Sequence, residues 1–273
     1  MSLLLLLDPL QVPIFETFVV PRYLSMFGAL ALDMLLPCEG AVVANLGSRT
    51  GYPDTDLSCY MPGCRIFGYD PAEEANELAR TKATLLRDAV AEYGVVDEPP
   101  FPAADGSFSH VISLYPMVDP ARRVELIAEA TRLLVPGGQV LCALPLRGSY
   151  QEVADLLREY ALKHDAGRVA KALEAHTTAR PTIETFGEIF EACGLTDVDV
   201  DMRLTTLTFP SGREFLEDPV ARLLVVPDMA LSLGLGDLSE PMEYVRNAID
   251  RYWSELDFEL SVNVGCASAR KPG

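Results

Sequence analysis

The sequence predicts a single α/β domain, residues 1–273, in which a mostly parallel sheet is covered by helices on both faces. Short apolar runs bounded by glycine or proline alternate with segments of helical periodicity, an alternation typical of parallel sheets. The chain is long enough for one large core, and its 49% hydrophobic and 23% charged residues indicate a globular protein. Glycine and proline are spread along the whole length, so no linker divides the chain.

The first half of the chain alternates helices with short buried strands. Residues 14–36 have apolar side chains at helical spacing and end at the turn cluster 37–40, so residues 1–40 form an N-terminal helical segment. The apolar run 41–46 lies between two glycines and predicts a strand that is buried on both faces. The same pattern predicts helices at 53–60, 71–87 and 121–134 and strands at 65–69, 91–96, 110–114 and 139–144. Residues 136–138, Pro-Gly-Gly, terminate the helix 121–134.

The second half adds more helices, two long strands and an insert. We expect helices at 150–164, 167–176, 182–193 and 242–253, and strands at 197–208 and 258–267. Six or seven strands then form one sheet around a core at residues 41–145. Residues 146–181 and 210–241 lie outside that core as lid or insert segments. The insert 210–241 is punctuated by proline and glycine, and it is the best candidate for a movable cover over a site.

The acidity of the chain argues against one class of partner. With 22 Lys and Arg against 40 Asp and Glu, the formal net charge is −18. Such a field repels phosphate backbones and anionic lipid surfaces, so we expect no nucleic-acid partner. Solubility is a simpler interpretation of the acidity than recognition of a basic partner.

The N-terminus and the cysteines bear on location. Residues Leu3–Leu7 are apolar, but Asp8-Pro9 ends the run far short of the roughly 18 residues that a membrane span needs. We therefore expect no membrane span, and a packed segment or a contact for a protein partner instead. The six cysteines form no C-x-x-C pair and only three histidines accompany them, so no metal site is predicted. Cysteines inside apolar runs indicate buried thiols in a reducing cytoplasm.

The carboxyl ends of the predicted strands gather the residues best suited to bind a ligand. Residues 45–51, Asn-Leu-Gly-Ser-Arg-Thr-Gly, form a turn whose glycines let the backbone approach a ligand, although many such turns hold glycine for steric reasons alone. Asp70 ends the next strand, where a carboxylate accepts hydrogen bonds from ribose hydroxyls; capping of the following helix is an equally sound role. Asp97 and Glu98 end the third strand and suit an exocyclic amine.

Four motifs in this order resemble the class I S-adenosylmethionine-dependent methyltransferases. The turn 45–51 resembles the glycine-rich first motif, residues 68–70 the second and residues 96–97 the third. The most specific piece is Arg132–Val140, with its Arg-Leu-Leu-Val-Pro-Gly-Gly signature. The resemblance runs from about Val42 to Leu144 and continues more weakly to Lys271. It implies a Rossmann-like sheet with an antiparallel last strand, and S-adenosylmethionine as the cofactor.

The resemblance also implies where the cofactor is held. Residues 47–51 would surround its methionine portion, Asp70 would bind the ribose, and Asp97 or Glu98 would lie near the adenine. Tyr115 is the side chain best placed to face the methyl group, with buried packing as its alternative role. The sulfonium already activates the methyl group, so no dedicated base is required and no catalytic residue is predicted. The residues expected at the cofactor are Asn45, Gly47, Ser48, Arg49, Gly51, Asp70, Pro71, Asp97, Glu98, Leu114 and Tyr115.

Three residues depart from the motifs of this family. Asn45 replaces the usual acidic residue, Arg49 replaces the middle glycine of the first motif, and Ser109 replaces an aspartate. Arg49 matters most, because a long side chain now occupies a turn where the cofactor approaches the backbone. It either turns outward or pairs with the cofactor carboxylate, which preserves binding, or it fills the pocket.

Two functions of different classes therefore follow from the sequence. The first is methyl transfer from S-adenosylmethionine to a small molecule or a carrier-bound acyl substrate. The alternative is a catalytically inactive, methyltransferase-like protein that binds a partner through the Leu-rich N-terminal segment or the insert 210–241. A nicotinamide-dependent oxidoreductase on a similar sheet is a third interpretation, and the Pro-Gly-Gly signature argues against it. His110 lies within a predicted strand and is expected to be packed or hydrogen-bonded, not catalytic.

Overall fold

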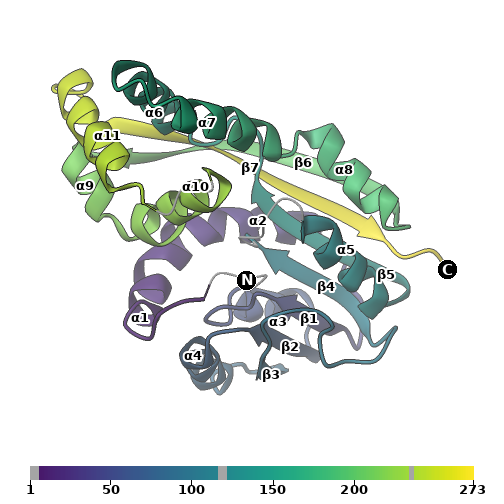
Figure 1. The fold of residues 1–273 in the computed structure, drawn as a ribbon. Coiled ribbons are helices and arrows are strands. Elements are labelled where there is room, and N and C mark those ends of the chain that lie inside the picture. Colours follow the sequence, from purple (N-terminus) through teal and green to yellow (C-terminus); the bar gives the residue numbers. More distant parts are fainter. Residues whose placement is uncertain (1–5, 116–121, 234–236) are drawn as a thin grey trace. The chain divides into compact units, whose positions relative to one another are not determined.

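The computed structural model describes residues 6–115, 122–233 and 237–273, and the chain divides into two compact units (Figure 1). The first unit comprises Met1–Leu144, Ile183–Met202 and Gly265–Gly273, and the second comprises Pro145–Thr182 and Arg203–Val264. Three parts of the sequence discussed above lie outside the described residues: residues 3–5 of the Leu-rich segment, residues 116–121 after Tyr115, and residues 234–236 of the predicted insert. The assignment of all residues to a single domain stays a prediction.

Within the described residues, seven strands form one sheet in the order β3-β2-β1-β4-β5-β7-β6. They are β1 Val42–Leu46, β2 Cys64–Asp70, β3 Ala89–Val95, β4 Phe108–Leu114, β5 Leu134–Pro145, β6 Thr196–Phe209 and β7 Phe258–Arg270. Strands β1 to β5 pair in parallel. Backbone hydrogen bonds join Gly137 to Lys271 and Leu146 to Asn263, so β7 runs antiparallel to β5. The predicted mostly parallel sheet with an antiparallel last strand is confirmed.

The strand order reverses at β1, which lies between β2 and β4. The register places Leu46 at the end of β1 beside Tyr69 of β2. Gly47 and Ser48 donate their backbone N–H groups to the Tyr69 carbonyl oxygen, at 2.8 and 3.1 Å, which holds the turn after β1 against the end of β2. Parallel sheets bind ligands where the strand order reverses, so the fold brings the first two predicted motifs to the expected place.

The first helices of the chain follow one another without a break. They are α1 Val12–Ile14, η1 Phe15–Leu24 and α2 Ser25–Asp33. Pro21 lacks a backbone donor, and the turns around it have the wider π-type geometry. Among the described residues, Val12–Asp33 is the one helical run long and apolar enough to cross a membrane by length and composition, yet half of its apolar window is buried inside the protein. Phe15, Tyr23 and Phe27 of this run are buried, so much of its apolar character serves packing inside the protein.

The remaining helices of the first unit lie close to their predicted positions. They are α3 Asp54–Tyr60, α4 Glu73–Ala83, α5 Arg123–Leu133 and α8 Ile183–Ala192. The strand predicted from residue 139 begins earlier, because β5 starts at Leu134, directly after α5, and residues 136–138 lie within it. Gly137, with φ of 75°, pairs with Lys271 of the last segment, and a Cβ on Gly138 would lie 2.9 Å from the Ser109 carbonyl oxygen. The two glycines therefore admit a close backbone contact between strands and do not form a turn.

The second unit is largely helical. Its helices are α6 Gln151–Lys163, α7 Gly167–Ala179, α9 Gly212–Glu217, η3 Ala221–Val225, α10 Val226–Leu233 and α11 Ser239–Tyr252. Much of the predicted insert 210–241 is thus helical. The rings of Phe209, Phe215 and Phe258 contact one another at centroid distances of 5.2 to 6.3 Å and form part of the apolar interior. The Arg180 guanidinium pairs with Asp228 and lies 4.7 Å above the centroid of the Tyr150 ring.

A tight contact between α9 and α11 gives a test of the second unit. A Cβ on Gly212 would lie 2.1 Å from the Arg246 carbonyl oxygen, so Gly212→Ala must displace backbone. We expect it to lower the free energy of unfolding by about 1–3 kcal/mol in urea denaturation. Gly167→Ala is the matched control, because its Cβ would meet no atom within 4 Å and alanine favours the helix. Equal stability of Gly212→Ala and the parent protein would contradict this packing.

Candidate cofactor site

The turn after β1 has the backbone shape that its glycines predict. Gly47 and Gly51 have φ angles of 77° and 78°, a region that favours glycine. Arg49 stands between them with φ of 49°, a conformation that a non-glycine residue rarely adopts. Ser48, Arg49 and Thr50 are all buried. The turn therefore keeps its fold although its middle glycine has been replaced.

Asp70 lies at the end of β2 against this turn. Its carboxylate has no exposed surface. Oδ2 accepts the backbone N–H of Arg49 at 3.1 Å, and Oδ1 accepts that of Ala72 at 3.0 Å. Ala72, not Asp70, is the residue that precedes α4, and half-buried Pro71 links the two. The carboxylate thus both fixes the turn after β1 and supports the chain that enters α4.

The Arg49 side chain folds back onto the same carboxylate. Its Nη1 atom lies 3.4 Å from Asp70 Oδ2, and the exposed fractions of the two side chains are 4% and 0%. Of the three conformations expected for Arg49, the structure therefore has the one in which the side chain fills the space beside the turn. The guanidinium thus lies against the carboxylate to which the resemblance assigns the ribose.

A buried hydrogen-bond network under the turn includes Asn45, the residue that replaces the usual acidic residue of the first motif. Asn45 donates through Nδ2 to the Tyr52 carbonyl oxygen at 3.1 Å and to Asp54 Oδ1 at 3.2 Å. The Tyr93 hydroxyl, from β3, donates to Asp54 Oδ2. Burial raises the pKa of Asp54 to about 6, while the hydrogen bonds from Tyr93 and Asn45 oppose the rise. The carboxylate missing at position 45 is thus supplied by Asp54, which the sequence had indicated only as part of a helix start.

The Tyr93 side chain explains two of the glycines. A Cβ on Gly68 would lie 2.4 Å from Tyr93 Cδ1, and one on Gly51 would lie 3.0 Å from the Tyr93 hydroxyl. Both positions must be small for the ring to cross from β3 to Asp54. Packing inside the protein therefore accounts for Gly51 and Gly68, and approach of a ligand is not needed to explain them.

The N-terminal helical run covers the turn with polar and aromatic contacts. Glu16 accepts a hydrogen bond from the Thr50 hydroxyl and forms an ion pair with Lys82 of α4, with 2.6 Å between Oε1 and Nζ. The rings of Tyr23 and Phe27 lie 5.4 and 5.3 Å from the ring of Tyr115, at the end of β4. These side chains, missed by motif analysis, join segments far apart in the sequence around the turn.

The predicted residues at the ends of the other strands fall into two groups. Leu114 and Tyr115 are buried, and Tyr115 has φ of 47°. Asp97 and Glu98 are exposed after the edge strand β3, and Glu98 Oε1 lies 3.4 Å from Arg122 Nη1. The structure brings Asn45, Gly47, Ser48, Arg49, Gly51, Asp70 and Pro71 together, with Tyr115 against the helix that covers them. Roles for Asp97 and Glu98 at an adenine stay predictions.

His110 is packed as expected. It is buried, with Nδ1 2.9 Å from the Ser109 hydroxyl and Nε2 2.9 Å from the Leu36 carbonyl oxygen. Burial lowers its pKa. Ser109 also bonds both backbone groups of Val42, at 2.9 and 3.1 Å, so its role is to join β4 to β1.

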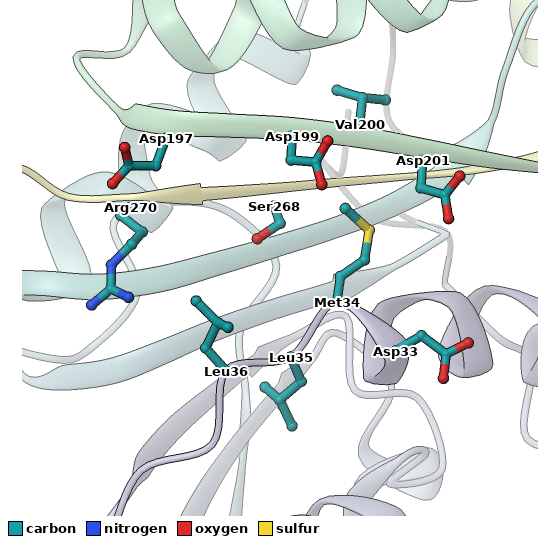
Figure 2. Close-up of a pocket in the computed structure, with 10 residues that line it drawn as sticks. All are labelled: Asp33, Met34, Leu35, Leu36, Asp197, Asp199, Val200, Asp201, Ser268 and Arg270. Carbon is teal, nitrogen blue, oxygen red and sulfur yellow. The ribbon is translucent and has the colours of Figure 1, made fainter.

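A groove of about 660 Å³ lies elsewhere in the first unit (Figure 2). Asp197, Asp199 and Asp201 of β6 line it together with Asp33 and Arg270. The Arg270 guanidinium donates to the Gly137 carbonyl oxygen. Within residues 6–115, 122–233 and 237–273, no group of three or more His, Cys, Asp or Glu side chains is placed to hold a metal ion. The acidity of the groove therefore does not form a metal centre.

Comparison with known proteins identifies the segment that contains the turn. Residues 43–138 match the family described as methyltransferase domain. This segment of the chain is therefore similar to a methyltransferase domain. S-adenosylmethionine is the cofactor that the sequence resemblance implies for this segment.

Two relatives of known activity share limited identity with the chain. The ribosomal RNA small subunit methyltransferase H of Burkholderia vietnamiensis is 26% identical over 215 residues, 71% of this chain and 67% of that protein. The carboxy-S-adenosyl-L-methionine synthase of Pseudomonas putida is 25% identical over 196 residues, 65% of this chain and 77% of that protein. The two relatives catalyse different reactions, so they do not choose a substrate for the methyltransferase domain.

Solved structures share the fold. The YcgJ protein of Bacillus subtilis has a TM-score of 0.57 at 12% identity, over 91% of this chain and 99% of that one. A phosphoethanolamine N-methyltransferase of Haemonchus contortus, solved with S-adenosyl-L-methionine, has a TM-score of 0.54 at 18% identity, over 90% of this chain and 52% of that one. At such identity the likeness concerns the fold alone.

The residues at the turn fit the cofactor of this family in kind, with one exception. A buried carboxylate at the end of β2 and a glycine of left-handed conformation at the end of β1 are suited to a ribose and to close backbone approach. Arg49 is the exception, because its guanidinium lies against Asp70 Oδ2. A ribose hydroxyl at Oδ2 would therefore meet the Arg49 guanidinium.

The raised pKa of Asp54 makes a prediction about pH. The folded protein holds this proton up to about pH 6, whereas an unfolded aspartate loses it near 3.8, so the stabilisation is complete below about pH 4 and is lost as pH rises through 6. Asp54→Asn lacks this dependence. Between pH 4 and 7 the unfolding free energy of the variant should rise by about 3 kcal/mol relative to the parent protein. Urea denaturation at both pH values measures it, and a pH-independent difference would contradict the buried state of Asp54.

Proposed function

We propose that this protein is an S-adenosylmethionine-dependent methyltransferase that acts in the cytoplasm on a small molecule or a carrier-bound acyl group. The position of Asp70 carries the proposal. A buried carboxylate at the end of β2, hydrogen-bonded to the turn after β1, is the acceptor that a ribose needs in this fold. The match of residues 43–138 to the family described as methyltransferase domain also supports S-adenosylmethionine as the cofactor.

The residues around the turn divide the work of binding. When bound, the cofactor supplies an electrophilic methyl group. The backbone of residues 47–51 would lie along its methionine portion, and Asp70 would accept the ribose hydroxyls. Tyr23, Phe27 and Tyr115 form an aromatic cluster at the end of β4, which would exclude water from a methyl group held there.

Charge and composition support a substrate other than nucleic acid. The relative from Burkholderia vietnamiensis is a ribosomal RNA methyltransferase, but this chain has a formal net charge of −18. Such a field opposes binding to a phosphate backbone. We therefore propose a small or carrier-bound substrate, as the sequence resemblance implies.

The thiols support the proposed location. Cys64, Cys142 and Cys266 are buried and all six cysteines are free. Burial raises the pKa of Cys142 to about 12, which leaves this thiol protonated and unreactive. Free, buried thiols suit a reducing compartment.

Two observations favour a second candidate function, which is binding of a protein partner without catalysis. The Arg49–Asp70 ion pair satisfies the carboxylate from within the protein. In addition, Leu6, Leu10, Ile14 and Phe18 are exposed and recur every four residues near the start of the chain. Such a row suits contact with another protein. The two candidates are separated by whether the protein binds the cofactor at all.

Isothermal titration calorimetry with S-adenosylhomocysteine tests the proposal. The parent protein should bind it, and Asp70→Asn should weaken binding about 10-fold or more, since a hydrogen bond to a charged acceptor contributes roughly 1.5–3 kcal/mol. Asp88→Asn removes an exposed carboxylate of the same unit and should bind as the parent does. Thermal unfolding of each variant checks that the fold is retained. Absence of binding to the parent protein at millimolar ligand would refute the methyltransferase proposal.

A further inference from the structure

Asp70 has two kinds of donor at one oxygen atom. Oδ2 accepts the backbone N–H of residue 49, which any amino acid other than proline supplies, and it lies 3.4 Å from the Arg49 guanidinium, which only the side chain supplies. A ribose hydroxyl that binds this oxygen would be a third donor. A carboxylate oxygen has two lone pairs, and Oδ2 already faces two donors of the protein in a site without exposed surface. At this oxygen the guanidinium and a ribose hydroxyl are therefore competitors.

The two backbone hydrogen bonds of Asp70 do not depend on this guanidinium. Without the side chain, Asp70 keeps the backbone N–H groups of residues 49 and 72, one on each oxygen. Residue 49 also has φ of 49°, where glycine is favoured over arginine. Arginine thus stands at a position that the backbone fits to glycine, and its long side chain returns to the one carboxylate at the end of β2. A residue kept in an unfavourable conformation at such a place suggests a role beyond packing.

We propose that Arg49 is the residue that sets cofactor affinity in this protein, by occupying the ribose-binding oxygen of Asp70. The inference rests on the proposed function, because it takes S-adenosylmethionine or its product as the ligand. Binding proceeds only with withdrawal of the guanidinium from Asp70 Oδ2. Since the charge-assisted contact is broken for each ligand bound, the side chain lowers affinity by about 10- to 100-fold.

Calorimetry of three proteins with S-adenosylhomocysteine tests the inference. Arg49→Gly removes the competitor and relaxes the turn, and it should bind about 10- to 100-fold more tightly than the parent protein. Arg49→Met keeps an unbranched stem but lacks the charge, so it separates competition for Asp70 from simple filling of space. Arg80→Ala is the control, because it removes a positive charge from α4 that pairs with Glu73 and does not contact Asp70. It should bind as the parent protein does.

The outcomes separate this inference from the proposed function. Tighter binding by Arg49→Gly supports the inference, and it does so even when the parent protein shows no binding, a result that refutes methyl transfer by the parent alone. Equal or weaker binding by Arg49→Gly beside a parent protein that binds overturns the inference and leaves the proposed function standing. Absence of binding to both overturns both.

Measurements without ligand show whether each variant is folded. Far-ultraviolet circular dichroism and thermal unfolding of the variants without ligand should show a folded protein in each case. If neither Arg49→Gly nor Arg49→Met folds, the side chain is structural and the inference is wrong. In folded variants, the increase in midpoint temperature produced by a fixed concentration of S-adenosylhomocysteine should be larger for Arg49→Gly than for the parent protein.

Discussion

A carboxylate without solvent contact has to be satisfied by donors of the protein or of a ligand, and the arrangement around Asp70 follows from that requirement. The parallel register of β1 and β2 brings the turn 47–51 next to the end of β2, so the backbone N–H of residue 49 reaches Oδ2. The chain then turns into α4, and the N–H of Ala72 reaches Oδ1. Both donors come from backbone that the sheet fixes in place. The Arg49 guanidinium is the added element, and it places an internal cation on the carboxylate that we propose as the ribose acceptor.

The glycines of the predicted ligand-binding region also have a packing role inside the protein. Gly51 and Gly68 leave room for the Tyr93 ring, which crosses from β3 to Asp54. Asp54 in turn holds Asn45 at the end of β1. A glycine-rich turn is therefore maintained by the protein interior even where a long side chain has entered it. This explains how the turn 45–51 keeps its backbone shape with arginine at its middle position.

Much of the fold could be predicted from the sequence, because apolar runs between glycines and prolines are direct signals of buried strands. All predicted strands of the first unit are present, and Asp70 lies at a strand end as its position after an apolar run indicates. The start of β5 could not be predicted, since Gly137 and Gly138 resemble a turn unless their pairing with Lys271 is known. The same limit applies to the site. Glu16 meets Thr50 and Lys82 across 34 and 66 residues, and no local pattern reports such a contact. The sequence also allowed three conformations of the Arg49 side chain. The choice among them depends on where Asp70 lies in three dimensions.

A crystal structure of the protein grown with S-adenosylhomocysteine would show directly which group occupies Asp70 Oδ2. We expect the ribose hydroxyls to bind Asp70 and the Arg49 side chain to have left Oδ2. A nucleoside bound elsewhere, with the guanidinium still on Asp70, would contradict it.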